Sequence, residues 1–178
     1  AQLFTVTGSV ESAQKAMAAL SDIASGLPFS IQEVTQAFIT LRNFGLKATE
    51  DSLKSYANIA AASGKALNDA IQAVANATVG EFERLKAFGI KAKVAGEQVT
   101  FTFRGIETQV DKTASAIGNY LEAIGSEDLA GAAARQVDTL GGAFSNPGDQ
   151  IALATNELAK EPGFIDQLTN TSRESTRT

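Results

Sequence analysis

Apolar residues recur three and four positions apart along most of the chain, which places them on one face of an α-helix. The first stripe runs from Val10 through Met17 and Leu20 to Ala24. Glycines or residues that favour a helix start lie at the ends of this stripe and of most later ones. The pattern therefore predicts a succession of helices. They run from Ser9 to Gly26, Ser30 to Gly45, Thr49 to Gly64, Gly64 to Gly80, Gly80 to Gly89, Asp111 or Thr113 to Gly125, Ser126 to Leu140 and Asp149 to Lys160.

The second of these helices has a clear start signal at Ser30. The Ser30 hydroxyl can accept a hydrogen bond from the Glu33 backbone N–H, while the Glu33 carboxylate accepts one from the Ser30 N–H. This reciprocal arrangement is a capping box, so a helix is expected to begin directly after Ser30. Its apolar face is expected to carry Ile31, Val34, Phe38 and Leu41.

The period of the pattern changes to two after Gly89. Residues 91–94 and 99–103 alternate in polarity on either side of a turn at residues 95–97, which predicts a β-hairpin. Gly105 allows a second turn, and residues 106–110 could add a third strand. Residues 1–7 alternate as well, and they predict either a short strand or a trimmed chain end.

These patterns predict a mainly α fold, a compact multi-helix domain with a small antiparallel β-hairpin or three-stranded meander near residues 91–110. We expect that domain to occupy residues 1–146. Residues 147–178 would form a helical extension and a loose polar end, because Asn146-Pro147-Gly148 interrupts the helical pattern. Charged residues interrupt every apolar stretch, so no membrane-spanning segment is expected.

The composition narrows the chemistry that this chain can perform. It contains no histidine and no cysteine, which excludes the common zinc sites and the Ser-His and Cys-His nucleophile pairs. Carboxylates remain as acid–base candidates, but no local pattern marks a pair that flanks a cleft. We therefore expect no catalytic residues, no enzymatic activity, no bound metal or cofactor, and no small-molecule substrate.

One motif occurs twice, as Leu41-Arg42-Asn43-Phe44-Gly45-Leu46-Lys47-Ala48 and as Leu85-Lys86-Ala87-Phe88-Gly89-Ile90-Lys91-Ala92. One interpretation is a duplicated ligand or partner site that presents phenylalanine and lysine together. The other is a helix C-cap, in which Gly45 adopts the left-handed conformation and Leu46 contacts Leu41 across it. The second copy places Leu85 and Ile90 in the same relation across Gly89. The residues that define this structural motif are Leu41, Phe44, Gly45, Leu46, Leu85, Phe88, Gly89 and Ile90.

The strongest basic cluster defines a candidate interaction surface. It consists of Arg84, Lys86, Lys91, Lys93 and Arg104, with phenylalanines between them. Such a pattern can bind single-stranded nucleic acid, so a nucleic-acid-binding module is the alternative hypothesis. Acidic residues lie among the same positions, however, and the net charge of −5 resides entirely in residues 111–178. This balance disfavours sequence-independent binding to DNA, which depends on clustered Lys and Arg.

Two stretches resemble the tape-measure proteins of long-tailed phages and prophages. Leu27-Pro28-Phe29 through Glu33-Val34 to Ala37-Phe38 resembles one characteristic segment of that family. Gly80-Glu81-Phe82-Glu83-Arg84-Leu85-Lys86-Ala87-Phe88-Gly89-Ile90-Lys91-Ala92, followed by Val99-Thr100-Phe101-Thr102-Phe103-Arg104-Gly105, is similar to its most recognisable stretch. The similarity extends over roughly residues 8–146, and the break at Asn146-Pro147-Gly148 departs from it.

The resemblance implies a structural protein that acts in tail assembly and tail-length determination. Such proteins lie inside the tail tube, in the lumen of the virion tail, and are assembled in the cytoplasm of the bacterial host. They work with the tail-tube protein, the tail-assembly chaperones and the tip complex, and they leave the tube when the viral genome is ejected. Self-association of the chain is also possible. The family supplies no catalytic residues for this stretch. Its members are much longer, so this chain would be one segment of such a protein or a prophage remnant.

Overall fold

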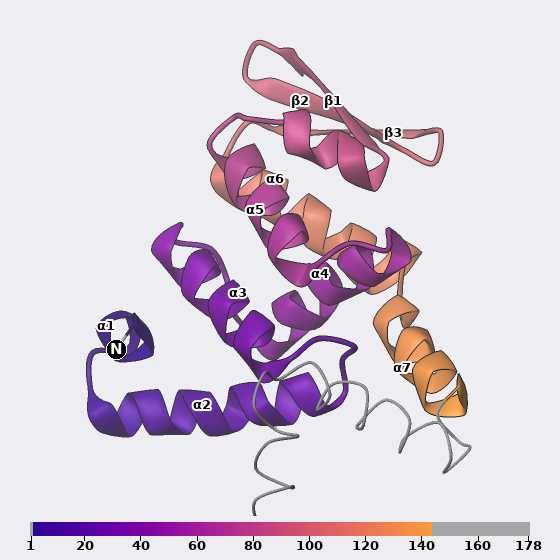
Figure 1. Cartoon of the computed structure of the whole chain (residues 1–178). Coiled ribbons are helices and arrows are strands. Elements are labelled where there is room, and N and C mark those ends of the chain that lie inside the picture. The colour runs from indigo at the N-terminus through magenta and orange to yellow at the C-terminus, as the bar shows by residue number, and fades with distance from the viewer. Residues whose placement is uncertain (1, 144–178) are drawn as a thin grey trace, which may run out of the picture. The chain divides into compact units, whose positions relative to one another are not determined.

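A computed structural model describes residues 2–143 of the chain (Figure 1). The chain divides into two compact units, Ala1–Val137 and Asp138–Thr178. The predicted boundary at residues 146–147, the helix predicted for Asp149–Lys160 and the polar end lie outside the described residues. The elements are α1 (Gln2–Thr7), α2 (Val10–Ser25), α3 (Ile31–Asn43), α4 (Glu50–Ala62), α5 (Leu67–Thr78), η1 (Glu83–Phe88), β1 (Ile90–Ala95), β2 (Gln98–Phe103), β3 (Ile106–Asp111), α6 (Ala114–Ala123), η2 (Ile124–Asp128) and α7 (Ala132–Ala143).

The fold class is mainly α with a small three-stranded antiparallel sheet, as the sequence predicts. Helix α5 packs against α3, α4 and α6 and against the short helix η1, so it occupies the centre of the first unit. The sheet contacts η1 through β1 and α6 through β3. Within the described residues, no helix is both long and apolar enough to cross a membrane.

Side-chain caps start several helices, and the strongest is the predicted capping box. The Glu33 N–H donates to Ser30 Oγ at 3.2 Å, and the Ser30 N–H donates to Glu33 Oε2 at 2.9 Å. Thr49 caps α4 and Thr113 caps α6, each accepting from a backbone N–H three residues later. Each cap satisfies backbone groups that a helix start otherwise leaves without partners.

The sheet has the order β1-β2-β3, and its two hairpins confirm the predicted meander. Phe101 of β2 lies opposite Ala92 of β1 and Thr108 of β3. Val99, Phe101 and Phe103 are buried on one face of the sheet. The β2–β3 turn places Arg104 at φ +50° and Gly105 at φ +81°, as a two-residue turn with two positive φ angles requires.

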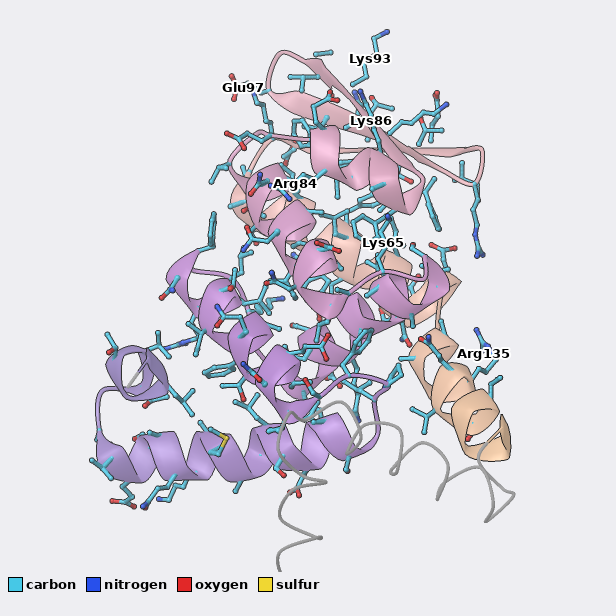
Figure 2. All side chains as sticks on the ribbon, viewed as in Figure 1. Lys65, Arg84, Lys86, Lys93, Glu97 and Arg135 are labelled. Carbon is cyan, nitrogen blue, oxygen red and sulfur yellow. The ribbon has the colours of Figure 1, made fainter. Side chains whose placement is uncertain are left out.

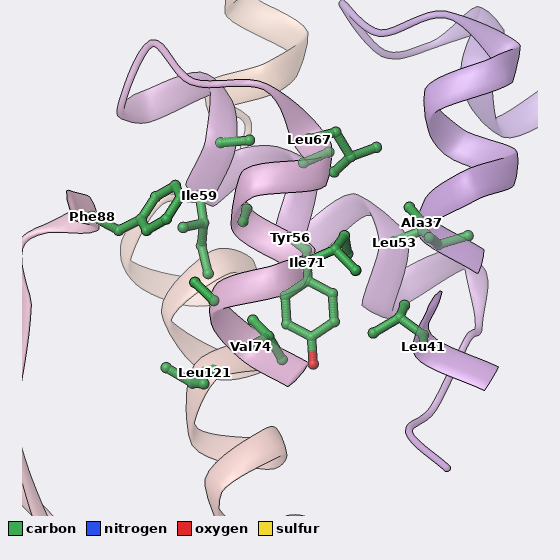
Figure 3. Close-up of a cluster of buried hydrophobic side chains, with 14 of the residues drawn as sticks. Ala37, Leu41, Leu53, Tyr56, Ile59, Leu67, Ile71, Val74, Phe88 and Leu121 are labelled. Atoms are coloured by element: carbon green, nitrogen blue, oxygen red, sulfur yellow. The ribbon is translucent and has the colours of Figure 1, made fainter. Parts of the chain in front are cut away.

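One continuous apolar core joins the helices and the inner face of the sheet. Figure 3 shows its central part, where the Tyr56 ring lies near Ile71 and Val74 and its hydroxyl points away from the cluster. Among its members, Leu41, Leu53 and Phe101 are fully buried. Other fully buried large side chains are Leu67, Ile71, Leu85, Ile90, Ile117, Leu121 and Ile124.

The strand expected within residues 1–7 is wrong, because Gln2–Thr7 forms helix α1. Leu3 is buried in the core and Val6, three positions later, packs against it. The Thr7 hydroxyl donates to the Leu3 carbonyl at 2.8 Å, which closes the turn. The alternation in polarity over so few residues is outweighed by contacts with α2, which follows directly, and with α3, which is more distant in sequence.

The apolar face expected for the first long helix is also partly wrong. Val10 is 62% exposed and Met17 is 42% exposed, whereas Leu20 and Ile23 are buried. Ile31, expected on the inner face of α3, is 39% exposed. The buried residues of α2 therefore lie in its C-terminal half, and only its partners in the fold determine which part of the stripe is covered.

The helix expected to end at Gly125 instead continues as a π-helical turn, η2. Ser126 does not cap a new helix. Its hydroxyl donates to the Glu122 carbonyl at 3.0 Å. Asn58 of α4 holds this region, since its Nδ2 donates to the Gly125 carbonyl at 2.9 Å and its Oδ1 accepts from the Ala133 N–H at 3.0 Å. Helix α7 then starts at Ala132 rather than at Ser126.

Candidate interaction surface and the repeated glycine motif

The first copy of the repeated motif ends α3 with a Schellman motif. Gly45 has φ +68°, its N–H donates to the Arg42 carbonyl at 3.1 Å, and the Leu46 N–H donates to the Leu41 carbonyl at 2.9 Å. These are the two backbone bonds that define this terminator. Leu41 is fully buried and Leu46 packs against the core, whereas Phe44 is 42% exposed.

The second copy ends a different kind of helix. Gly89 has φ +75° and its N–H donates to the carbonyls of Leu85 and Lys86, but the helix that it ends is the 3₁₀ helix η1. Ile90 then begins β1 and pairs with Phe103. Phe88 is only 7% exposed, in contrast to Phe44. The two copies therefore share a left-handed glycine and a buried leucine, but they present different surfaces.

Two helices with unrelated sequences at their ends use the same terminator. At the end of α4, the Lys65 N–H donates to the Ala60 carbonyl at 3.0 Å across Gly64. At the end of α5, the Glu81 N–H donates to the Asn76 carbonyl at 2.9 Å across Gly80. Since Gly64 and Gly80 lack the Phe-Gly context, glycine is the shared requirement for this geometry. The phenylalanine and lysine of the motif are not needed for it.

Replacing Gly45 by alanine is expected to lower the free energy of unfolding by about 1–2 kcal/mol, since a Cβ is disfavoured at positive φ. No neighbouring atom lies within 4 Å of the added Cβ, so backbone strain is the only cost. Gly45→Asn is the matched control, because asparagine tolerates this conformation better. Urea denaturation of both variants measures the difference, and equal losses would show that Gly45 acts through something other than its φ angle.

The basic cluster does not form one uniform face. Lys91 and Lys93 are exposed on the outer face of β1, because Ile90 and Ala92 point to the inner face. Arg84 and Lys86 belong to η1, which lies under the inner face, where Phe82 contacts Phe101 edge-to-face. Figure 2 shows Arg84, Lys86 and Lys93 with Glu97 in the same region.

Two of the five basic side chains already have partners. The Lys86 ammonium lies 2.7 Å from the Glu83 carboxylate in an exposed ion pair. Arg104 lies over the Phe103 ring at 5.2 Å and donates to the Asp128 carbonyl at 3.3 Å. On the outer face of the sheet, Thr102 of β2 lies between Lys91 of β1 and Glu107 of β3. The cluster is therefore divided between two faces and contains acids.

Sequence reasoning missed a pocket beside the first copy of the motif. Its volume is about 250 Å³, and it lies between the loop after α3, helix α4 and helix α6. Tyr56 and Glu122 meet there, although each looks ordinary in the sequence. The one signal is Glu122 directly after the buried Leu121, which places a carboxylate at the margin of the apolar stripe of α6. Within the described residues, no group of three or more acidic side chains could hold a metal ion.

The fold and these features define a helical domain with a packed antiparallel meander, glycine-terminated helices and a small pocket with polar and apolar lining. Comparisons with protein-family models, with curated proteins and with solved structures found no match for the chain.

Proposed function

We propose that this chain is a structural segment of a phage or prophage tail tape-measure protein that acts in tail assembly inside the tail tube. The observation that carries the proposal is the resemblance of residues 80–105 to the family's most recognisable stretch. These residues form η1, β1 and β2 and share one apolar core with the helices. If proteins share a structural role through one stretch of sequence, that stretch is expected to form one contiguous folded element, as residues 80–105 do here.

The proposed role is contact with other tail proteins rather than measurement of length by this segment alone. If all 178 residues formed one helix, it would extend only about 270 Å at about 1.5 Å per residue. The described residues instead fold back on themselves around one core. Tail-tube protein, assembly chaperones and the tip complex are therefore the partners that we propose, with the full-length parent protein setting the length.

The proposal is tested in the parent phage or prophage. We expect the chain to lie within a long reading frame beside tail-tube and chaperone genes. Deleting residues 2–137 in frame is expected to abolish tails or to change their length, which electron microscopy of the particles measures. A deletion of equal length elsewhere in the same reading frame is the control. An isolated short gene away from tail genes, or normal tails after the deletion, would contradict the proposal.

Nucleic-acid binding through the basic cluster stays the alternative hypothesis. Lys91 and Lys93 favour it, because both are exposed on one face of β1. It predicts salt-sensitive DNA binding that is lost when both lysines are changed to glutamate. The same double change at Lys15 and Lys54, which are exposed on α2 and α4, controls for net charge. If a gel-shift assay at low salt detects no binding, the alternative is wrong.

A further inference from the structure

The pocket beside the first glycine motif has one apolar wall and several polar groups. Leu46, Ala114 and Gly118 supply the apolar wall. The polar groups belong to Lys47 of the loop after α3, to Tyr56 of α4, and to Ser115, Asn119 and Glu122 of α6. All these residues lie within the unit Ala1–Val137, and α4 and α6 contact each other directly. The pocket is therefore built by packed helices.

The Tyr56 hydroxyl is the most unusual group in this pocket. Tyr56 is only 2% exposed, and its ring is held in the apolar core, while the hydroxyl points away from that cluster (Figure 3). No residue of the described part of the chain hydrogen-bonds to this hydroxyl, which lines the pocket and is not among the fully buried polar atoms without a partner. Burial, and then the nearby Glu122 carboxylate, raises the pKa of Tyr56 well above its usual range, so the hydroxyl stays protonated. A polar group held in this way has a hydrogen bond to gain from a ligand.

Glu122 supplies an unpaired negative charge at the same place. Its side chain is half-buried, and none of the ion pairs of the described residues includes it. Lys47, the basic residue in the pocket lining, instead donates to Asn119 Oδ1 at 3.0 Å. As far as the described residues go, one carboxylate and two hydroxyl oxygens, those of Tyr56 and Ser115, are thus free to accept hydrogen bonds in a pocket with an apolar wall. A positively charged group with several N–H donors on an aliphatic stem complements this arrangement.

We infer that this pocket receives the guanidinium or ammonium group of a basic side chain from a partner protein. Glu122 pairs with the charge, the Tyr56 and Ser115 oxygens accept further N–H donors, and the aliphatic stem lies against Leu46 and Ala114. Lys47 opposes binding, because its ammonium places a like charge at the pocket and its flexible stem lets it compete for Glu122. The inference does not depend on the proposed role in phage tails.

The binding test is an NMR titration of the whole chain with N-acetyl-arginine-N-methylamide. Saturable shifts are expected at the amides of Gly118 and Asn119, with a Kd on the order of millimolar for so small a probe. The lysine analogue is expected to bind at the same place. N-acetyl-citrulline-N-methylamide, which has the same shape without the charge, is expected to bind about tenfold more weakly. Equal binding of the citrulline and arginine probes would overturn the inference.

Three pocket variants separate the role of each side chain. Glu122→Gln is expected to weaken binding of the arginine probe about tenfold, and Tyr56→Phe about threefold to tenfold, since each removes an acceptor but keeps the side-chain shape. Lys47→Gln is expected to tighten binding about threefold, since it removes a like charge. Glu107→Gln, the same charge change on the outer face of the sheet, is expected to leave the Kd unchanged.

The opposite signs expected for Lys47 and Glu122 keep the inference falsifiable even if one variant folds poorly. The amide spectrum of each variant shows whether it is folded before the titration begins. If folded Glu122→Gln binds the arginine probe as tightly as the parent, the pocket is a water-filled hollow between helices and the inference is wrong. If no probe shifts Gly118 or Asn119 at any concentration, it is wrong as well.

Discussion

Replacing Gly125 by alanine is expected to lower the free energy of unfolding by about 3 kcal/mol or more, the upper part of the range for overpacking. An added Cβ would lie 2.0 Å from the Ser55 carbonyl oxygen and 2.5 Å from its carbonyl carbon. Both are backbone atoms of α4, so no side-chain rotation can relieve the overlap. The helices must separate, and the Asn58 bonds to the Gly125 carbonyl and to the Ala133 N–H would be strained at the same time.

Gly118→Ala is the matched control for this prediction. Gly118 lies in α6, seven residues before Gly125, is buried too, and would place its new Cβ 3.9 Å from the nearest atom, Leu46 Cδ2. That distance is ordinary van der Waals contact, and alanine favours the helix over glycine by about 1 kcal/mol. Chemical denaturation followed by circular dichroism should therefore show a severe loss for Gly125→Ala and little change or a gain for Gly118→Ala. Similar effects of the two substitutions would show that α4 and η2 are not in close contact.

The features that the sequence predicted correctly are those that depend on a few neighbouring residues. A serine and a glutamate three positions apart are enough to specify the capping box at Ser30. A glycine after a helical stripe is enough to end α3 at Gly45, and alternation around Gly96 and Gly105 is enough to define the meander. Each of these signals is confined to one helix end or to neighbouring strands joined by a short turn, so the local pattern contains the information.

The features that the sequence missed depend on residues far apart along the chain. Gly125 looks like a helix end, but the helix continues because Gly125 lies against Ser55 and is bonded by Asn58, which comes from α4. The exposed Met17 and the buried Ile23 belong to the same helix, α2, and only its contacts with α1 and α3 decide which of them is covered. The pocket at Tyr56 and Glu122 exists because α4 and α6 pack together. No local pattern joins those two residues.

Replacing Phe101 by alanine is expected to detach the sheet from the helices and to cost about 3–5 kcal/mol. Phe101 is fully buried on the central strand. Its ring stacks on Tyr120 of α6, with centroids 4.7 Å apart, and meets Phe82 edge-to-face at 5.8 Å. A small sheet depends on packing of its apolar face for stability, and this one ring joins β2 to α6 and to the segment before η1.

Hydrogen exchange separates this mechanism from a general loss of stability. In Phe101→Ala, the amides of β1, β2 and β3 are expected to exchange much faster, while those of α3, α4 and α5 keep more of their protection. Ile106→Ala is the matched control on the same sheet, because Ile106 is 65% exposed and its truncation removes few contacts. If Phe101→Ala lowers protection equally in the sheet and in the helices, the sheet and the helical core unfold as one unit. In that case the resembling stretch at residues 80–105 owes its stability to the whole domain, and a tail-assembly role would have to involve the helices together with the sheet.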